Sequence, residues 1–450
     1  MMLLEEVASK LNKDFKENLA VKGIGHLKLK RIPFTSPRLN YITYGGIPRG
    51  RLTMFAGKES SGKSTTALDI VKNGQITFKQ EYEEELKSLR KKIKDDEKIL
   101  NDKNTTKKQK DEIKKTLPED KERLAYLEKR GVLQIVYFDA EGTIDKDWAA
   151  KLGVDTENMW IVQLHQQTAE QFLDQVLRVV RDADNVGLIV IDSIAVLVPQ
   201  LVHGESLEQK SMGGNAAVVT MFCNEVCPIL GKKGIAAIAI QQVRDSMNPY
   251  AEFTIPGGNA LKLACSLIMI FQKGKFIDAE GHEQKNSFET PQGNQVWTRI
   301  QKTKISKADR RVGFYTLNYD YGVDVVADLI PMAIDTGVII KGGSWFTITD
   351  PQDPSGYMTF EDGNPVKFQG QVNMMNFLRE DEAAYNFVES RVNAIVSGHK
   401  EDYLQIDAET DAKALAEAQE DEMVAEGGIK VRETEEINYE APDEIPPDDM

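Results

Sequence analysis

Four short apolar runs, each followed by a segment of helical periodicity, organise the middle of the chain. The runs are Leu52 to Ala56, Leu133 to Phe138, Val186 to Ile191 and Gly234 to Ile240, and the clearest helical segments are Ala169 to Val180 and Ala216 to Leu230. Strands that alternate with helices form a mostly parallel sheet with helices on its faces. The pattern therefore predicts an α/β core with a mostly parallel, twisted sheet.

Residues 81–130 do not follow that alternation. They contain 30 charged residues, and their sparse apolar positions recur at helical spacing in two halves, Leu86 to Leu100 and Ile113 to Leu127. This pattern favours an inserted, charged helical hairpin that projects from the core, broken near residues 101–106 and again near Pro118. A solvated charged spacer is the alternative interpretation of the same residues.

The two ends of the chain lack the apolar content of a core. Leu3 to Glu17 has helical periodicity, and Leu27 and Leu29 then alternate with lysines, which predicts a small N-terminal helix-strand module. Residues 401–450 hold 18 acidic and 3 basic residues, which leaves 53 of each sign in residues 1–400. We expect the segment after about Tyr403 to be a disordered acidic tail, while the neutral body does not exclude a polyanionic partner.

Composition narrows the class of protein. No uninterrupted apolar run approaches the roughly 18 residues that a membrane-spanning helix needs, so a membrane protein is not expected. The first twelve residues alternate apolar and charged side chains, unlike a secretory signal. Three cysteines, Cys223, Cys227 and Cys265, cannot form a disulfide scaffold in 450 residues, which agrees with a reducing compartment and predicts a cytoplasmic protein.

A phosphate-binding loop is indicated by Gly57-Lys58-Glu59-Ser60-Ser61-Gly62-Lys63-Ser64-Thr65, in which two spaced glycines precede a lysine and hydroxyl residues. A predicted strand precedes the loop and a helix follows it, so backbone N–H groups and the positive end of the helix converge on phosphate oxygens. We expect Lys63 to neutralise the β- and γ-phosphates and the Ser64 hydroxyl to bind Mg²⁺.

Two carboxylates stand at or just past the ends of predicted strands. Asp192 ends an apolar run, where it would hold the Mg²⁺ shell through water. The alternative for Asp192 is a helix cap after a buried strand. Glu141 follows Phe138 by three residues and is the candidate general base for hydrolysis, with an exposed loop carboxylate as the alternative.

Taken in order, these residues resemble the RecA family of ATP-dependent homologous recombinases. Five blocks match the family in sequence order: Glu59 to Ser64, Asp139-Ala140-Glu141 with Lys151 to Asp155, Val190 to Ser193, Gln242-Val243-Arg244, and Gly257 to Lys262. Gly337 to Ile339 and Gly342 to Phe346 look like the start of the family's small C-terminal domain, and an acidic tail is common in the family. The 81–130 insertion is absent from the ordinary bacterial form, which favours a divergent, phage-encoded version.

The resemblance implies roles for residues around a nucleotide. Glu141 would activate water, Trp148 would stack on adenine, and Asp145 would face the adenine amino group. Gln242 would sense the γ-phosphate and pass the signal into the DNA-binding loop that follows it. An ordinary amide at the end of a strand is the alternative for Gln242.

The same resemblance implies a polymer. Lys302 and Lys304, in a strand predicted at Thr298 to Lys304, would reach the ATP of the neighbouring subunit and make that nucleotide part of the interface. Residues 3–30 would dock on a neighbour's core, with a local cap on their own domain as the alternative. The implied assembly is a helical filament.

Two loops are the DNA-binding elements that the resemblance implies. Their candidate contacts are Lys210 and Met212 in Glu205 to Gly213, and Arg244, Met247, Tyr250, Phe253, Gly257, Gly258 and Asn259 in and after Arg244 to Gly257. Cations and apolar wedges in such loops suit sequence-independent binding of a stretched single strand. Each loop taken alone would be interpreted as a mobile connection.

The function that follows is a DNA-dependent ATPase that forms helical filaments on single-stranded DNA, pairs it with homologous duplex DNA and exchanges strands. ATP and Mg²⁺ are the expected cofactors, and a single-strand binding protein and a loading mediator are expected partners. The alternatives are a ring-forming helicase or motor on the same core and an ATP-binding regulatory scaffold. The expected units are an N-terminal oligomerisation module at 1–35, the ATPase core at 36–330, a small α+β domain at 331–403 and the tail at 404–450.

Overall fold

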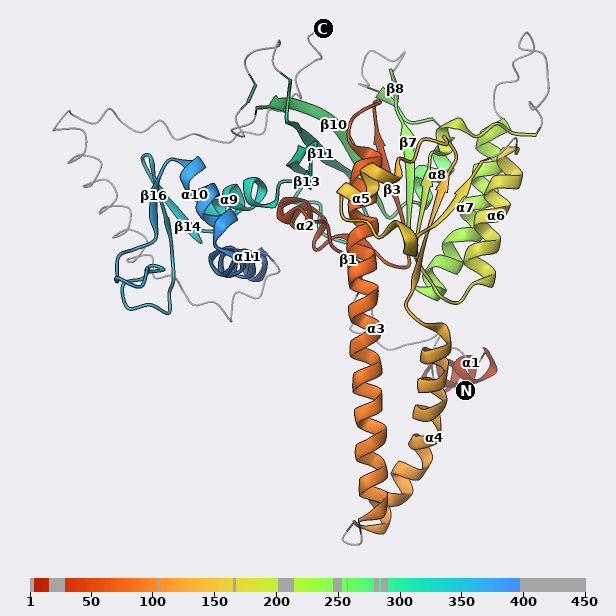
Figure 1. Cartoon of the computed structure of the whole chain (residues 1–450). Helices are drawn as coiled ribbons and strands as arrows, with labels where there is room; N and C mark the ends of the chain where they lie inside the picture. The colour runs from red at the N-terminus through yellow and green to blue at the C-terminus, as the bar shows by residue number, and fades with distance from the viewer. Residues whose placement is uncertain are drawn as a thin grey trace, which may run out of the picture.

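A nine-stranded mixed sheet lies at the centre of the described part of the molecule (Figure 1). The computed structural model describes residues 4–15, 29–102, 105–164, 167–200, 214–245, 253–256, 258–278, 283–284 and 290–396. In spatial order the strands are β13 (Gly322–Val323), β12 (Val312–Asn318), β11 (Gly293–Thr303), β10 (Leu267–Ile277), β3 (Leu52–Gly57), β7 (Ala236–Gln242), β6 (Val186–Asp192), β4 (Gln134–Asp139) and β5 (Trp160–Gln163). The strands from β10 to β5 pair in parallel, and β10 to β13 pair antiparallel, so the predicted α/β fold is confirmed.

Two apolar layers hold helices against this sheet, because its central strands are buried on both faces. On one face, Met54 of β3 belongs to a cluster with Phe172 of α6 (Ala169–Asp182) and Val219 of α7 (Gly214–Lys233). On the other face, Phe55 packs in a cluster with Ile70 of α3 (Lys63–Asn101). The smaller elements of the core are α2 (Pro37–Thr43), α5 (Lys146–Lys151), α8 (Gly258–Ala264), β1 (Arg31–Ile32), β2 (Ile47–Pro48), β8 (Arg244–Asp245), β9 (Phe253–Thr254), η1 (Thr156–Asn158) and η2 (Ile194–Val196).

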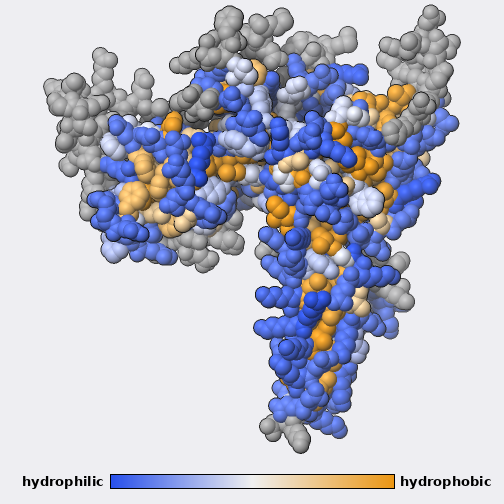
Figure 2. Space-filling view, in the orientation of Figure 1, coloured by the Kyte–Doolittle hydropathy of each residue, from blue (hydrophilic) through white to orange (hydrophobic). Residues whose placement is uncertain are grey.

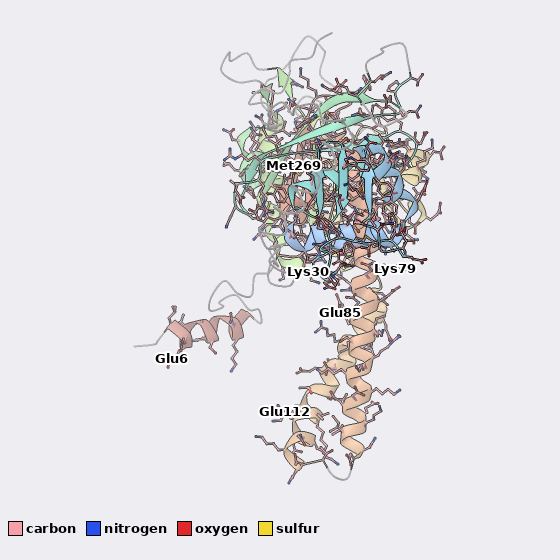
Figure 3. The ribbon with its side chains drawn as sticks, turned by 90° about the vertical axis from the view of Figure 1, so that its left-hand side faces the viewer. Glu6, Lys30, Lys79, Glu85, Glu112 and Met269 are labelled. Atoms are coloured by element: carbon pink, nitrogen blue, oxygen red, sulfur yellow. The ribbon has the colours of Figure 1, made fainter. Side chains whose placement is uncertain are left out.

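The charged insertion forms a helical hairpin that extends far from the sheet (Figures 1 and 3). Its first helix is the continuation of α3, a single helix of 39 residues, and its second is α4 (Lys107–Arg130). Leu89, Ile93, Leu117 and Leu127 are buried between the two helices. Figure 2 shows this apolar seam as a narrow band between hydrophilic flanks.

The prediction of a helix break near Pro118 is wrong, whereas the break near residues 101–106 is confirmed, because α3 ends at Asn101 and α4 begins at Lys107. Pro118 lies inside α4, which continues to Arg130. A proline removes one backbone donor from a helix. The buried neighbour Leu117 and the ion pair between Lys92 and Asp120 (2.7 Å) hold this stretch of α4 against α3, which keeps the helix intact.

The C-terminal unit has its own apolar cluster. It consists of α9 (Val325–Asp335), β14 (Ile339–Gly342), β15 (Trp345–Ile348), β16 (Lys367–Gln369), α10 (Gln371–Glu380) and α11 (Glu382–Val396). Ser36, the N-cap of α2, donates a hydrogen bond to the buried Asp328 of α9, which ties this unit to the core. The small α+β domain predicted from the sequence therefore has a three-stranded sheet covered by helices.

At the N-terminus the predicted helix is present as α1 (Leu4–Phe15), and the remaining residues of the predicted range, Leu3, Lys16 and Glu17, lie outside the described residues. Figure 3 shows it apart from the hairpin, with Glu6 on its surface. The predicted extended stretch lies largely outside the described residues, as does the acidic tail after Tyr403. Within the described ranges, no helix combines the length and apolar character needed to cross a membrane.

Candidate active site

The chain leaves β3 through a tight loop that opens α3. At Gly57 a Cβ atom would come within 2.4 Å of the Phe271 carbonyl oxygen on the adjacent strand, so a larger residue does not fit. Ser60 and Gly62 have φ angles of 57° and 87°. Left-handed residues of this kind direct successive backbone N–H groups toward one concavity. The loop thus presents N–H groups and the start of α3 at the carboxyl end of β3, an arrangement that binds phosphate.

Lys63 is the first residue of α3, and its side chain is only 7% exposed. Its ammonium group donates to the Lys58 carbonyl oxygen (2.5 Å) and lies 3.4 Å from Ser61 Oγ. Burial lowers the pKa of Lys63, and the carboxylates of Asp192 and Glu141 oppose that shift. A phosphate oxygen at the mouth of the loop would accept from the same ammonium group and complete its pairing.

The remaining loop residues line the mouth of the loop. Glu59, Ser60 and Ser64 are exposed, and Thr65 is half-buried. Ser61 is buried because its hydroxyl donates to the Lys58 carbonyl oxygen (2.8 Å) and so closes the turn. The sequence motif is therefore folded into one compact loop, with its hydroxyl residues on both sides of Lys63.

Asp192 ends β6 and is 5% exposed. One of its oxygens, Oδ2, accepts hydrogen bonds from Ser64 Oγ (2.7 Å) and from the buried Tyr137 hydroxyl on β4 (2.6 Å). Burial raises the pKa of Asp192, and the two hydroxyl donors act against that rise. These contacts join the carboxylate to the phosphate loop, so the alternative role as a helix cap is not what its side chain does.

Glu141 lies two residues after β4, on a loop whose backbone is held in place by a buried carboxylate. The buried Asp139 carboxylate accepts N–H bonds from Gly142 (2.8 Å) and Thr143 (3.2 Å). Ser193 Oγ donates to Glu141 Oε1 (2.5 Å), and the Glu141 N–H donates to the Asp192 carbonyl oxygen (3.3 Å). Glu141 is therefore a positioned carboxylate beside Lys63 rather than a freely exposed one.

Gln242 is the last residue of β7, directly beside Gly57 in the sheet register. The next residue, Val243, donates its N–H to the Gly57 carbonyl oxygen (3.2 Å). The segment that leads into the second predicted DNA loop is thus attached to the first residue of the phosphate loop. This attachment gives a direct route between the two, and the sensing role of Gln242 stays a prediction.

The residues predicted to contact adenine lie on one short helix. Asp145 caps α5 by accepting N–H bonds from Asp147 (2.9 Å) and Trp148 (3.1 Å). Trp148 is half-buried against the cluster that also contains Ile70. The cap fixes the start of α5, the apolar cluster packs against the indole, and the contacts of Asp145 and Trp148 with a base stay predictions.

Lys302 and Lys304 lie at the end of β11, on the C-terminal carbonyls of α8. Lys302 Nζ donates to the Lys262 and Leu263 carbonyl oxygens, and Lys304 Nζ donates to the Leu263 carbonyl oxygen at 2.7 Å. Burial, and then the charge of Lys304, lowers the pKa of Lys302. Their contact with a neighbouring subunit's nucleotide stays a prediction.

Of the predicted DNA-binding positions, Lys210, Met212, Met247, Tyr250 and Gly257 lie outside the described residues. Arg244 and Phe253 are on the paired strands β8 and β9, with Arg244 opposite Thr254. Gly258 and Asn259 open α8. The second loop therefore has a short antiparallel ribbon at its base. The sequence did not indicate this ribbon, because the loop has no regular apolar period.

Three contacts of the site had no role in the sequence interpretation. Ser193 bonds Glu141, Tyr137 bonds Asp192, and Tyr315 OH lies 2.8 Å from Thr66 Oγ1 in the first turn of α3. A buried tyrosine usually finds a partner for its hydroxyl. In the sequence, the hydroxyl of Tyr137 inside an apolar run indicates only that a partner is needed, and the pairing of β4 beside β6 makes Asp192 that partner.

The sheet, the loop after β3, the carboxylate that follows β4 and the one that ends β6 define a P-loop NTPase core of the α/β class. Comparison with known sequences agrees: the RecA N-terminal domain model matches residues 114–324, a range that begins inside α4. Protein RecA of Chlorobium chlorochromatii is 26% identical over 382 residues, which cover 84% of this chain and 86% of that protein. Protein RecA of Mycobacterium ulcerans is 28% identical over 350 residues, 77% of this chain and 78% of that protein, and Protein RecA of Aquifex aeolicus is 27% identical over 358 residues, 77% and 83%.

The chain is similar to RecA proteins over 77% to 84% of its length, at 26% to 28% identity. The range matched by the family model includes Glu141, Asp192 and Gln242 and begins after the phosphate loop at residues 57–65. This similarity and the fold agree with the resemblance found in the sequence.

Proposed function

We propose that the chain is an ATP-dependent DNA recombinase that forms helical filaments on single-stranded DNA and catalyses homologous pairing and strand exchange. Similarity to RecA proteins supports a DNA-dependent ATPase, and the site supports the hydrolytic part of the activity. ATP would be bound by the loop at residues 57–65, with Lys63 on its phosphates. Glu141 would orient and deprotonate the attacking water.

One observation supports this function best. Lys63, Ser64, Glu141 and Asp192, which come from three separate segments of the chain, are connected around the start of α3 by the hydrogen bonds from Ser64 to Asp192 (2.7 Å) and from the Glu141 N–H to the Asp192 carbonyl oxygen (3.3 Å). Gln242 pairs with Gly57 in the sheet, and the chain continues from Gln242 toward the second predicted DNA loop. Because Gln242 and the phosphate loop lie at the same edge of the sheet, this edge can couple phosphate chemistry to a DNA-binding element.

The residues around Asp192 fit Mg²⁺. Ser64 offers a hydroxyl oxygen, and Asp192 offers a buried carboxylate whose Oδ2 already has two hydroxyl donors. Oxygen ligands from a hydroxyl and one carboxylate, completed by phosphate and water, are what this ion prefers in nucleotide sites. When bound, the ion would screen negative charge between the phosphates and Asp192, while Lys63 acts from the loop.

A DNA-stimulated ATPase assay tests the proposal. We expect hydrolysis that rises strongly when single-stranded DNA is added, and open helical filaments in electron micrographs with ATP and DNA. Closed rings would instead indicate a motor on the same core. Hydrolysis that does not respond to DNA would favour the regulatory scaffold and would contradict the proposed function.

The Tyr137 hydroxyl is expected to position Asp192 for the Mg²⁺–nucleotide complex. Tyr137→Phe keeps the buried ring and removes only the 2.6 Å hydrogen bond, so the fold should be retained. Loss of a hydrogen bond that orients a carboxylate near a metal weakens metal binding by about tenfold or more. We expect ADP affinity to fall about tenfold with Mg²⁺ present and to stay unchanged in EDTA, as measured by calorimetry.

Tyr126→Phe is the matched control for that measurement, because Tyr126 is 51% exposed on α4, away from the site. It should bind ADP as the parent chain does under both conditions. Equal Mg²⁺-dependent affinities for the Tyr137 variant and the parent would refute the positioning role.

A further inference from the structure

The hairpin of residues 81–130, which we call the arm, is the largest element that the proposed function does not use. α3 runs without interruption from Lys63 in the phosphate loop to Asn101 at the tip. At about 1.5 Å per residue, this helix is roughly 58 Å long. Figure 1 shows the arm on the opposite side of the core from β8, and Figure 3 places Glu85 near its base and Glu112 near its tip.

Interactions within the arm account for most of its apolar side chains, with Ile99 and Tyr126 exposed, and for part of its charge. The seam around Leu89 and Leu117 is buried between the helices. Four ion pairs cross from α3 to α4: Glu85 to Arg123 (2.5 Å), Arg90 to Glu128 (2.8 Å), Lys92 to Asp120 (2.7 Å) and Glu97 to Lys121 (2.6 Å). A partner of the arm would therefore be recognised by charge more than by apolar area.

The remaining charge is unevenly distributed along the arm. Residues 91–115, its distal part, contain 10 lysines and 6 acidic residues. The proximal residues, 81–90 and 116–130, contain 6 basic and 8 acidic residues. The distal part is thus net positive and the proximal part net negative, although residues 1–400 as a whole are neutral.

Six lysines account for the excess positive charge of the distal part. They are Lys91, Lys94, Lys107, Lys108, Lys114 and Lys115, all exposed and, among the described residues, without an ion-pair partner. Seven residues make almost two helical turns, so Lys107 and Lys114 share one face of α4, as do Lys108 and Lys115. Rows of cations about 10 Å apart along a helix match a repeating polyanion better than a single ligand.

We propose that the distal part of the arm binds the phosphate backbone of duplex DNA. Nonspecific DNA binding is driven by lysine and arginine charges that displace counterions from phosphates. The distal part has no arginine and no aromatic residue. It therefore lacks the side chains that stack on unpaired bases or read base edges bidentately, which favours the duplex backbone over single strands.

This surface is separate from the predicted DNA loops. β8, at the base of the second loop, lies on the other side of the core (Figure 1). The arm would hold a duplex away from the single strand and, through α3, connect that duplex to the phosphate loop. The proposal does not rest on the proposed function, because arm binding requires neither nucleotide nor strand exchange.

The test replaces the six distal lysines of the full chain with glutamine, which has a similar helix propensity and should leave the arm folded. Binding of a fluorescent blunt-ended duplex is measured by anisotropy in EDTA, without nucleotide, over a series of NaCl concentrations. We expect at least tenfold weaker binding at low salt. The slope of log affinity against log salt should become shallower by about 0.9 for each phosphate that the variant no longer neutralises.

The matched control replaces the same six lysines with arginine and should keep the affinity and the salt slope of the parent. Circular dichroism of both variants checks that the helices are intact. A glutamine variant with the parent's affinity and slope, or an arginine variant as weak as the glutamine variant, would overturn the proposal. If glutamine weakens duplex binding only after residues 404–450 are removed, the acidic segment occupies the arm in the full chain, which would overturn duplex binding by the arm of the full chain.

Discussion

Replacing Glu141 with glutamine is expected to lower ATP turnover by about 10²- to 10⁴-fold, the usual contribution of a general base. Glutamine has the same shape and can still accept the hydrogen bond from Ser193, but it cannot take a proton from water. Nucleotide binding and DNA-dependent assembly should therefore persist. A coupled ATPase assay with saturating single-stranded DNA, together with electron microscopy of the same samples, measures both.

Asp147→Asn is the matched control, since Asp147 is an exposed carboxylate on α5 in the same strand-loop-helix segment. It should change turnover by no more than a few-fold. A Glu141→Gln protein that hydrolyses ATP at the parent rate would remove Glu141 from the catalytic role and leave the site without its proposed base.

Replacing Lys63 with alanine is expected to weaken nucleotide binding by about 10- to 150-fold. A charge-assisted hydrogen bond to phosphate is worth about 1.5 to 3 kcal/mol, and about 1.4 kcal/mol corresponds to a factor of ten. The alanine variant should fold, because it removes a buried cation and places a strong helix former in the first turn of α3. Titration with a fluorescent ATP analogue measures the affinity, and thermal melting without nucleotide checks the fold.

Lys58→Ala removes a positive charge from the same loop but from an exposed side chain, so it is the matched comparison. Its nucleotide affinity should remain within a few-fold of the parent value. If the Lys63 variant binds nucleotide as tightly as the Lys58 variant does, the loop is not the phosphate site that its backbone suggests.

The loop and its two carboxylates could be predicted from sequence because their positions follow from the chain order. Each stands where a buried strand ends, and parallel strands bring their carboxyl ends to one edge of a sheet. The motif residues from Gly57 to Thr65 are also contiguous in the chain, so their arrangement depends only on the local backbone. The spacing therefore placed Lys63, Glu141 and Asp192 near one another without any knowledge of strand order.

Contacts that depend on strand register could not be predicted in this way. The partner of Tyr137 follows from β4 pairing beside β6, which brings its hydroxyl to Asp192. The continuity of α3 was hidden because its second half is charged on most faces, which resembles a spacer as much as a helix. Local propensity predicts a break at Pro118, because it does not include the packing of α4 against α3.

The most direct test of the central claim is strand exchange between a labelled single strand and a homologous duplex, with ATP and Mg²⁺, beside a non-homologous duplex of equal length. We predict ATP-dependent transfer of the strand from the homologous duplex alone. Hydrolysis stimulated by DNA but without transfer, or equal transfer from the non-homologous duplex, would contradict a recombinase.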